Sequence, residues 1–127
     1  MKLARRVVAT LVMLAWTWPL QAGELGEKAL PLKIKEWIKG QPVDVTKVDG
    51  KRVYVVEFWA NWCAPCIHSI PHLTELQRKF GDKNVTFIGV SVDNDKTVEK
   101  VKPFVKDMGD KMDYTVAIDD GGQTAKA

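Results

Sequence analysis

The 127-residue sequence has little excess charge once its first 22 residues are set aside. Three of its 19 lysines and arginines, namely Lys2, Arg5 and Arg6, precede Gly23, whereas all 16 aspartates and glutamates follow it. Nucleic-acid-binding domains carry clustered basic residues, because contacts to phosphate supply much of their affinity. The balance of charge therefore gives no support for a nucleic-acid partner.

The sequence also lacks an apolar run of the ~20 residues that a membrane-spanning helix needs. The run from Val7 to Leu20 has only 14 residues, follows the basic N-terminus and is followed by the small residue Ala22. This order is typical of a secretory signal peptide. We expect residues 1–22 to be a signal and residues 23–127 to form one exported domain, periplasmic or otherwise extracytoplasmic. If the signal stays uncleaved, it would hold the domain at a membrane.

Cysteine is nearly absent, since Cys63 and Cys66 are the only two. They form a Cys-x-x-Cys pair between an apolar run at 53–58, which indicates a β-strand, and a stretch with helical periodicity at 63–80. Two thiols at this spacing can close a small disulfide ring with little movement of the backbone. A thiol at a helix start is also stabilised as thiolate by the helix dipole. The pattern points to thiol–disulfide exchange.

The position of each cysteine in the expected helix predicts its role. Cys63 lies at the helix start, where backbone N–H groups have no partner, so it should be exposed and act as the nucleophile. Cys66 shares a helix face with Ile70 and Leu73. It should be buried and act as the resolving thiol, which attacks the mixed disulfide formed on Cys63. Pro65 lies in the first turn, where its missing N–H costs nothing.

Glu57 is an acid within an otherwise apolar strand. A buried carboxyl needs a partner or must be neutral, so burial would raise its pKa and allow it to exchange a proton with Cys66. The alternative is that Glu57 turns outward at the strand end and has only a structural role. Trp59 and Trp62 flank the turn; both could be core residues, or one ring could form an apolar docking surface beside Cys63.

The cysteine pair has three alternative interpretations. A structural disulfide is one, although a ring this small stabilises a fold poorly. A metal site with His68 and His72 is another, but at 100° per residue both histidines point away from the thiols. Haem attachment requires a histidine directly after Cys66, where the sequence has Ile67. We therefore expect no metal ligands and no cofactor.

The remaining sequence predicts an α/β fold with a parallel central sheet flanked by helices. The stretch from Glu24 to Lys39 should contain a short edge strand. The 53–58 strand should be buried on both faces, because it is almost continuously apolar. The other expected elements are a helix at 63–80 that is kinked by Pro71 and stopped by Gly81, a strand at 85–92, a helix at 98–108 interrupted by Pro103, and a strand at 114–118.

The segment from Phe58 to Cys66, FWANWCAPC, and the strand segment from Phe87 to Val90, FIGV, resemble the thioredoxin superfamily. Together with the export signal, they resemble its exported TlpA/ResA-type thiol–disulfide oxidoreductases. The resemblance implies a thioredoxin-like fold, with Cys63 as the attacking and Cys66 as the resolving cysteine. It matches Glu57 to the buried acid of thioredoxins. It also implies exported protein disulfides or dithiols as substrates, an unidentified electron donor, and reduction as the direction of exchange.

The substrate should meet the protein around Cys63, so Trp62, Ala64 and Pro65 are the candidate substrate-binding residues. In the family, the chain continues with a helix, a cis-proline loop that faces the disulfide, a β-hairpin and a final helix. This sequence ends at Ala127 and has no proline after Pro103. We therefore expect it to be a fragment without the C-terminal ββα portion of the fold.

Overall fold

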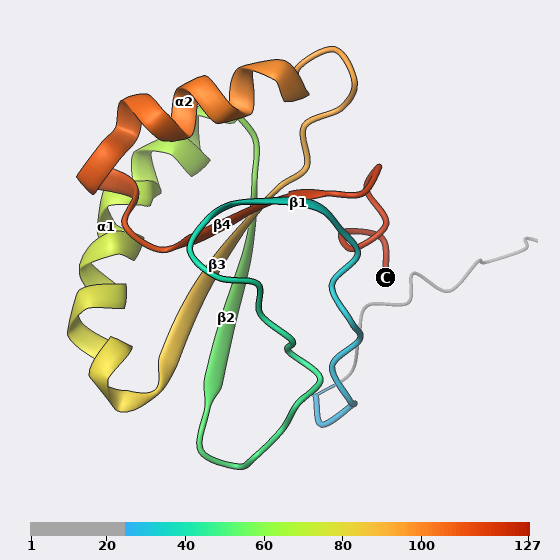
Figure 1. Cartoon of the computed structure of the whole chain (residues 1–127), viewed down its shortest axis with the longest axis vertical. Helices are drawn as coiled ribbons and strands as arrows, with labels where there is room; N and C mark the ends of the chain where they lie inside the picture. The colour runs from blue at the N-terminus through green and yellow to red at the C-terminus, as the bar shows by residue number, and fades with distance from the viewer. Residues whose placement is uncertain (1–24) are drawn as a thin grey trace, which may run out of the picture.

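The computed structural model describes residues 25–127, so the expected signal peptide lies outside the described part. The elements of the described part, in chain order, are β1 (Ile34–Lys39), β2 (Val53–Trp59), α1 (Ala64–Phe80), η1 (Gly81–Lys83), β3 (Val85–Ser91), η2 (Val98–Lys100), α2 (Val101–Met108), η3 (Gly109–Met112) and β4 (Thr115–Asp119). Each expected strand and helix is present, with ends shifted by a few residues. Figure 1 shows how they are arranged.

The four described strands form one mixed sheet in the order β1-β4-β3-β2. β2, β3 and β4 are parallel, whereas β1 pairs with β4 in the antiparallel direction. The predicted edge strand and the parallel arrangement of the three core strands are therefore confirmed, whereas the antiparallel direction of the edge strand was not predicted. Alternating apolar residues identify a strand and its buried face; they carry no information about its direction in the sheet.

β2 is the edge strand opposite β1 in the described sheet, and it contacts β3 alone among the strands. The prediction that it is buried on both faces is therefore wrong for residues 25–127. Val53 is 54% and Phe58 44% exposed, the residues between them are partly buried, and of the seven residues only the last, Trp59, is fully buried. An apolar run indicates that both faces of a strand make contacts, but the neighbouring elements decide how completely each face is covered.

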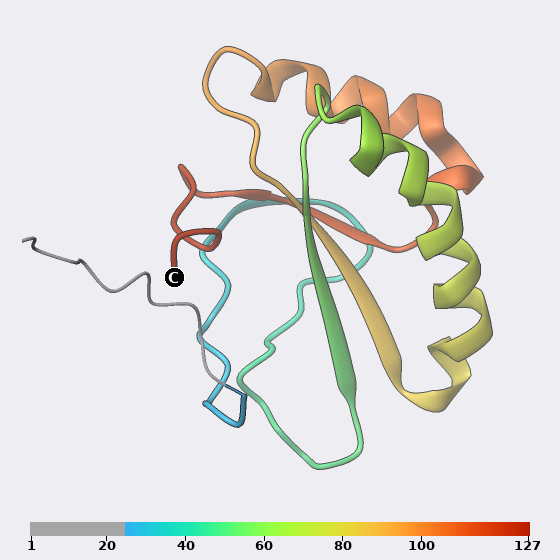
Figure 2. The same ribbon diagram turned by 180° about the vertical axis from the view of Figure 1, so that it is seen from behind.

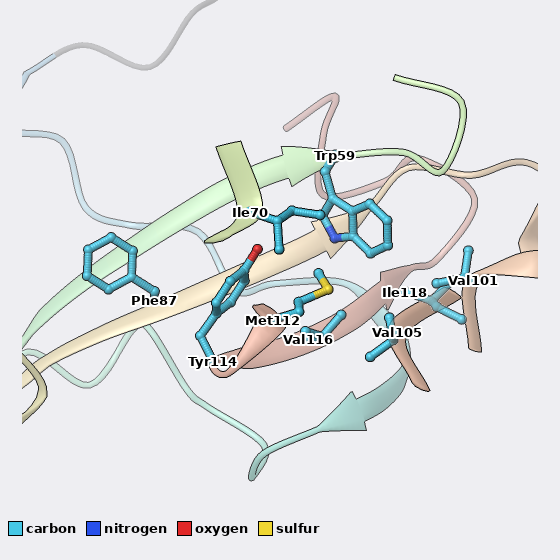
Figure 3. Packing of buried hydrophobic residues seen from close by; sticks show 9 residues of the cluster. All are labelled: Trp59, Ile70, Phe87, Val101, Val105, Met112, Tyr114, Val116 and Ile118. Carbon is cyan, nitrogen blue, oxygen red and sulfur yellow. The ribbon is translucent and has the colours of Figure 1, made fainter. Parts of the chain in front are cut away.

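Both α-helices pack on the same face of the sheet (Figures 1 and 2). Their side chains join those of the strands in one cluster, here called the helix-side cluster and drawn in Figure 3: Trp59, Ile70, Phe87, Val101, Val105, Met112, Tyr114, Val116 and Ile118. Cys66 is among the partly buried residues packed against this cluster. The main core of the domain therefore lies directly behind the cysteine pair.

The opposite face of the sheet has a smaller core, formed by Val45, Ile88 and Val90. Tyr54 and Val56 of β2 pack against it, as does Leu32 from the segment before β1. The long connection between β1 and β2 supplies Val45, so loop segments instead of helices cover this face in the described part (Figure 1). Alternate residues of β2 thus face different cores, which decides where Glu57 points.

Hydrogen bonds from two side chains fix α1 against the elements below it. Gln77 accepts a bond from the N–H of Phe87 at 2.8 Å and donates one to the carbonyl of Val85 at 3.2 Å. Thr74, which is 2% exposed, donates to the carbonyl of Lys111 at 2.8 Å and accepts from the N–H of Asp113 at 2.9 Å. These bonds tie α1 to β3 and η3, so the helix that begins at the cysteine pair has a fixed position.

Two predicted helix signals act differently from expectation. Gly81 adopts right-handed helical angles and continues into η1, and the turn to left-handed backbone comes at Asn84, with φ of 61°. α1 thus ends at Phe80 with Gly81 as its C-cap, as predicted, but Gly81 lacks the left-handed backbone typical of a glycine cap. Pro103 is the third residue of α2 and lies in its first turn, where a missing N–H breaks no bond. Pro71 lies inside α1, as predicted.

Candidate active site

Cys63 and Cys66 form a disulfide where β2 ends and α1 begins. Cys63 is the N-cap residue of α1, and its Cα lies 5.3 Å from that of Cys66. The turn is closed by two backbone bonds: the Cys63 N–H donates to the Ala60 carbonyl, and the Ile67 N–H donates to the Cys63 carbonyl. The spacing of the pair thus produces the small ring that was expected.

The two cysteines differ less in exposure than we predicted. Both are partly buried in the disulfide form, so this state does not show the expected contrast between an exposed Cys63 and a buried Cys66. The disulfide explains this, because it draws both sulfur atoms to the same turn. They still differ in surroundings, since Cys66 packs against the helix-side cluster. This asymmetry favours Cys63 as the thiol that meets a substrate.

The start of α1 suits a negatively charged sulfur. The helix has 17 residues, its first turn contains no acidic side chain, and Pro65 occupies an early position where no N–H is needed. No side chain caps the helix start, so the first backbone N–H groups have no side-chain acceptor there. Such a terminus stabilises a thiolate on Cys63 when the pair is reduced.

Glu57 points into the helix-side core. Side chains alternate along β2, and Val55 and Trp59, its neighbours on the same face, both contact the helix-side cluster. Burial raises the pKa of the Glu57 carboxyl, and a hydrogen bond from Tyr114 partly offsets this effect. The Tyr114 hydroxyl donates that bond to Oε1 of Glu57 at 2.8 Å. The interpretation of Glu57 as an outward-facing strand-end residue is therefore wrong.

The two tryptophans beside the turn have separate environments. Trp59 is 1% exposed, and its ring lies 5.4 Å from that of Phe104 in the core, whereas Trp62 is 64% exposed. Ala64 and Pro65 are also exposed. The predicted substrate-binding residues, Trp62, Ala64 and Pro65, thus lie at the surface around Cys63. Phe58, at 44% exposure on the outer strand β2, adds an apolar side chain that the sequence did not single out.

The turn before Cys63 is fixed from the other side by Asp93. Its carboxylate Oδ2 accepts a bond from the N–H of Asn61 at 3.0 Å and another from the Ser91 hydroxyl at 2.8 Å. The Asn61 side chain in turn donates to the carbonyl of Thr97 at 2.9 Å. Asp93 is 8% exposed. The loop after β3 therefore holds the Asn61 backbone and side chain, and with them the turn that carries Cys63.

His68 and His72 lie on the solvent side of α1, and Nδ1 of His72 is 3.8 Å from a carboxylate oxygen of Glu75. Within residues 25–127, no group of three or more His, Cys, Asp or Glu side chains is arranged to hold a metal ion. In the same part of the chain, no helix is both long enough and apolar enough to cross a membrane.

Sequence reasoning missed Tyr114 and Asp93. The sequence indicates only the start of a strand at Tyr114 and a turn at Asp93. The sequence indicates that an acid inside an apolar strand, such as Glu57, needs a hydrogen-bond donor, but it does not indicate which residue supplies it. Asp93 directly follows β3, and the carboxyl ends of adjacent parallel strands share one edge of the sheet.

A Cys-x-x-Cys turn between a strand and a helix, with a partly buried carboxyl on the core side of the strand, defines a thioredoxin-like thiol–disulfide site. The Redoxin family matches residues 25–127, and the chain belongs to this family. Among curated relatives, the thiol-disulfide oxidoreductase ResA of Bacillus thuringiensis is 35% identical over 103 residues, which are 81% of this chain and 56% of the relative. The thioredoxin-like protein YneN of Bacillus subtilis is 30% identical over 93 residues, 73% of this chain and 51% of the relative. The chain thus spans about half the length of these relatives.

Solved structures confirm the thioredoxin-like fold. A secreted disulfide oxidoreductase of Mycobacterium tuberculosis, homologous to DsbE of Escherichia coli, matches with a TM-score of 0.55 and 26% identity. That match covers 76% of this chain and 66% of the other. StoA of Bacillus subtilis matches with a TM-score of 0.60 and 20% identity over 79% of this chain and 71% of the other. At this low identity, the match to StoA supports the fold but no inference about function.

Proposed function

We propose that this protein exchanges thiols and disulfides with exported protein substrates through Cys63 and Cys66, acting as a reductant. The observation that carries the proposal is the Cys63–Cys66 disulfide at the start of α1, with Cys63 as the N-cap and Cys66 against the core. The curated relatives named thiol-disulfide oxidoreductase support the same chemistry. A structural disulfide is disfavoured, because a ring closed over so few residues constrains the unfolded chain little.

The reaction begins with the reduced pair. The Cys63 thiolate attacks one sulfur of a substrate disulfide, so that an S–S bond forms between Cys63 and the substrate while the substrate disulfide breaks. The other substrate sulfur leaves as a thiolate and takes a proton. Exposed Trp62, Ala64 and Pro65 surround the point of attack and provide an apolar surface for the substrate chain.

The second step releases the substrate. The Cys66 thiol gives its proton to the Glu57 carboxylate, and the resulting thiolate attacks the sulfur of Cys63. The Cys63–Cys66 disulfide forms, and the second substrate thiolate leaves. The substrate disulfide has then gained two electrons and the cysteine pair has lost two. A dithiol electron donor must reduce the pair before the next cycle.

An extracytoplasmic site of action fits this chemistry, because disulfides persist outside the reducing cytosol. The basic N-terminus followed by the run from Val7 to Leu20 supports export, and the secreted relative from Mycobacterium tuberculosis agrees with it. The reductive direction rests on the family resemblance and on Ala64 and Pro65, which place no cation between the cysteines to stabilise a thiolate. Measuring the reduction potential of the pair against glutathione would decide the direction.

The proposal is tested by mixing the reduced protein with insulin as a model disulfide substrate. Alkylation followed by mass spectrometry then counts the free thiols on both proteins. We expect each Cys63–Cys66 disulfide that forms to be matched by one insulin disulfide reduced, with Cys63→Ser as the inactive control. Reduction no faster than by free dithiothreitol at equal thiol concentration would overturn the proposal.

Changing Glu57 to glutamine should slow the second step while leaving the first nearly unchanged. The amide can still accept the Tyr114 hydroxyl bond, but it cannot take a proton from Cys66. We expect about a 10²-fold slower release of substrate thiol near neutral pH, the lower end of what a positioned base contributes. Alkylation of Cys63 by iodoacetamide should proceed at the parental rate. Parental release rates between roughly pH 6 and 9, the range in which thiols titrate, would leave Glu57 with only a structural role.

The same variant should also alter how stability depends on pH. The pKa of Glu57 is higher in the folded protein than in an unfolded chain, because the fold buries the carboxyl. Its stabilising contribution is therefore complete below the unfolded pKa and is lost as pH rises through the folded pKa. The free energy of unfolding of Glu57→Gln, measured in urea, should not show this decrease as pH rises.

A further inference from the structure

The partly buried Glu57 carboxyl has one protein hydrogen-bond donor among the described residues, the hydroxyl of Tyr114. The two residues are 57 positions apart and meet because β2 and the segment entering β4 flank the same strand, β3. Tyr114 is 5% exposed and belongs to the helix-side cluster. In Figure 3 its hydroxyl points toward β2, on the side where Ile70 lies. The aromatic ring is held by the core, so the hydroxyl has a fixed position.

Gly89 of β3 makes room for this contact. In the register of the sheet it lies directly beside Glu57. A Cβ atom at this position would lie 2.9 Å from Cε2 of Tyr114, 3.3 Å from Oε1 of Glu57 and 3.2 Å from Nε1 of Trp59. Real Cβ contacts of 2.9 Å are essentially absent from proteins, so a side chain here would push the tyrosine and the glutamate apart. Glycine at this position therefore leaves the space in which Tyr114 and Glu57 meet.

Trp59 provides a sensor at the same place. Its Nε1 is buried and has no hydrogen-bond partner among residues 25–127. Figure 3 shows this nitrogen on the side of the ring that faces Ile70 and Tyr114. A change in charge on the Glu57 carboxyl would alter the field at the indole N–H.

We propose that Tyr114 is a positioning residue, whose hydroxyl holds the Glu57 carboxyl over Gly89 so that the carboxyl can exchange a proton with Cys66. The proton exchange rests on the proposed function, whereas the contact itself rests on the structure. Because the hydroxyl occupies Oε1, the other carboxylate oxygen, Oε2, receives the proton from the Cys66 thiol. Cys66 then attacks the mixed disulfide as an anion, so charge and protons balance within the step.

Few other groups compete for this carboxyl. β3 presents Gly89 beside it, and Val55 and Trp59 are its apolar neighbours along β2. Tyr114 is the titratable side chain in contact with it, and α1 brings Cys66 to the same cluster. Burial and the neighbouring Glu57 charge raise the pKa of Tyr114, so the tyrosine remains a hydrogen-bond donor throughout the working range of the protein. Its bond in turn lowers the pKa of Glu57 relative to burial alone.

The test compares Tyr114→Phe with the matched control Tyr54→Phe. Tyr54 lies on the other face of β2, against the opposite core, and its replacement should leave Glu57 untouched. The carboxyl titration of Glu57 is followed by carbon-13 NMR in the reduced protein, together with the indole N–H signal of Trp59. We expect the Glu57 midpoint to move to higher pH in Tyr114→Phe and to stay at the parental value in Tyr54→Phe.

Kinetics then test the link to Cys66. Below the pH midpoint of Glu57, substrate release should be about tenfold slower in Tyr114→Phe than in the parent, because a hydrogen bond to a charged group contributes about that factor. At high pH the two rates should be equal. Gly89→Ala should move the midpoint in the same direction.

The outcomes separate the two levels of the proposal. An unchanged Glu57 midpoint in Tyr114→Phe would overturn the positioning role whether or not the protein exchanges disulfides. A shifted midpoint with a parental rate profile would overturn the proton exchange with Cys66. Failure of the parent protein to reduce insulin would instead overturn the proposed function, and the NMR titration would still decide whether Tyr114 positions Glu57.

Discussion

Replacing Cys66 with serine will leave the protein covalently attached to its disulfide substrates. In this variant Cys63 can still attack, because the helix start that stabilises its thiolate is intact. No thiol remains on α1 to break the resulting mixed disulfide. The adduct should therefore accumulate to nearly one substrate per chain, while the parent protein shows almost none.

Cys63→Ser is the matched control, because it removes the other sulfur of the same ring. Cys66 packs against the helix-side cluster and should meet a protein substrate far less readily than Cys63. The measurement is non-reducing electrophoresis and mass spectrometry after incubation with insulin. Equal adduct formation by both variants would contradict the assignment of nucleophile and resolving thiol, and adducts on Cys63→Ser alone would reverse it.

Local sequence signals predicted the core of this site because its key elements are adjacent in the chain. The strand before the turn, the cysteine pair and the helix after it lie within residues 53–80, and each follows from apolar periodicity and spacing. Glu57 was identified as unusual because its neighbours on β2 are apolar. The expectation that burial raises its pKa agrees with the structure.

Contacts between distant segments could not be predicted in the same way. Tyr114 meets Glu57 because β3 lies between β2 and β4, and that strand order is set by packing of the whole sheet. The same holds for Asp93, whose carboxylate reaches back to Asn61 across the carboxyl edge of the sheet. One sequence without a strand order gives no basis for choosing either partner.

Burial was also harder to predict than secondary structure. The apolar run of β2 suggested a central strand, yet β2 contacts only β3 among the described strands. Trp59 and Trp62 looked equivalent in sequence, since both flank the turn. Side chains alternate between the two faces of β2, which places Trp59 in the core, and the chain leaves the sheet at Ala60, which leaves Trp62 at the surface.

Trp59→Ala should destabilise the fold strongly. The side chain is 1% exposed, packs on Phe104 and belongs to the helix-side cluster. Truncating a buried tryptophan to alanine costs about 3–5 kcal/mol, because contacts are lost and a cavity remains. A domain of this size has a net stability of about 5–15 kcal/mol, so a large share of that stability should disappear.

Trp62→Ala is the matched control, three residues further along the chain and 64% exposed. Its free energy of unfolding in urea should stay within about 0.5 kcal/mol of the parent, as for most surface substitutions. Exchange with insulin should nonetheless fall about tenfold, since an aromatic anchor at a docking surface contributes more than ~1 kcal/mol. Exchange with oxidised glutathione, which is too small to use that surface fully, should fall much less. Similar losses of stability in both variants would contradict the division between core and surface, and unchanged insulin exchange in Trp62→Ala would remove Trp62 from the substrate-binding surface.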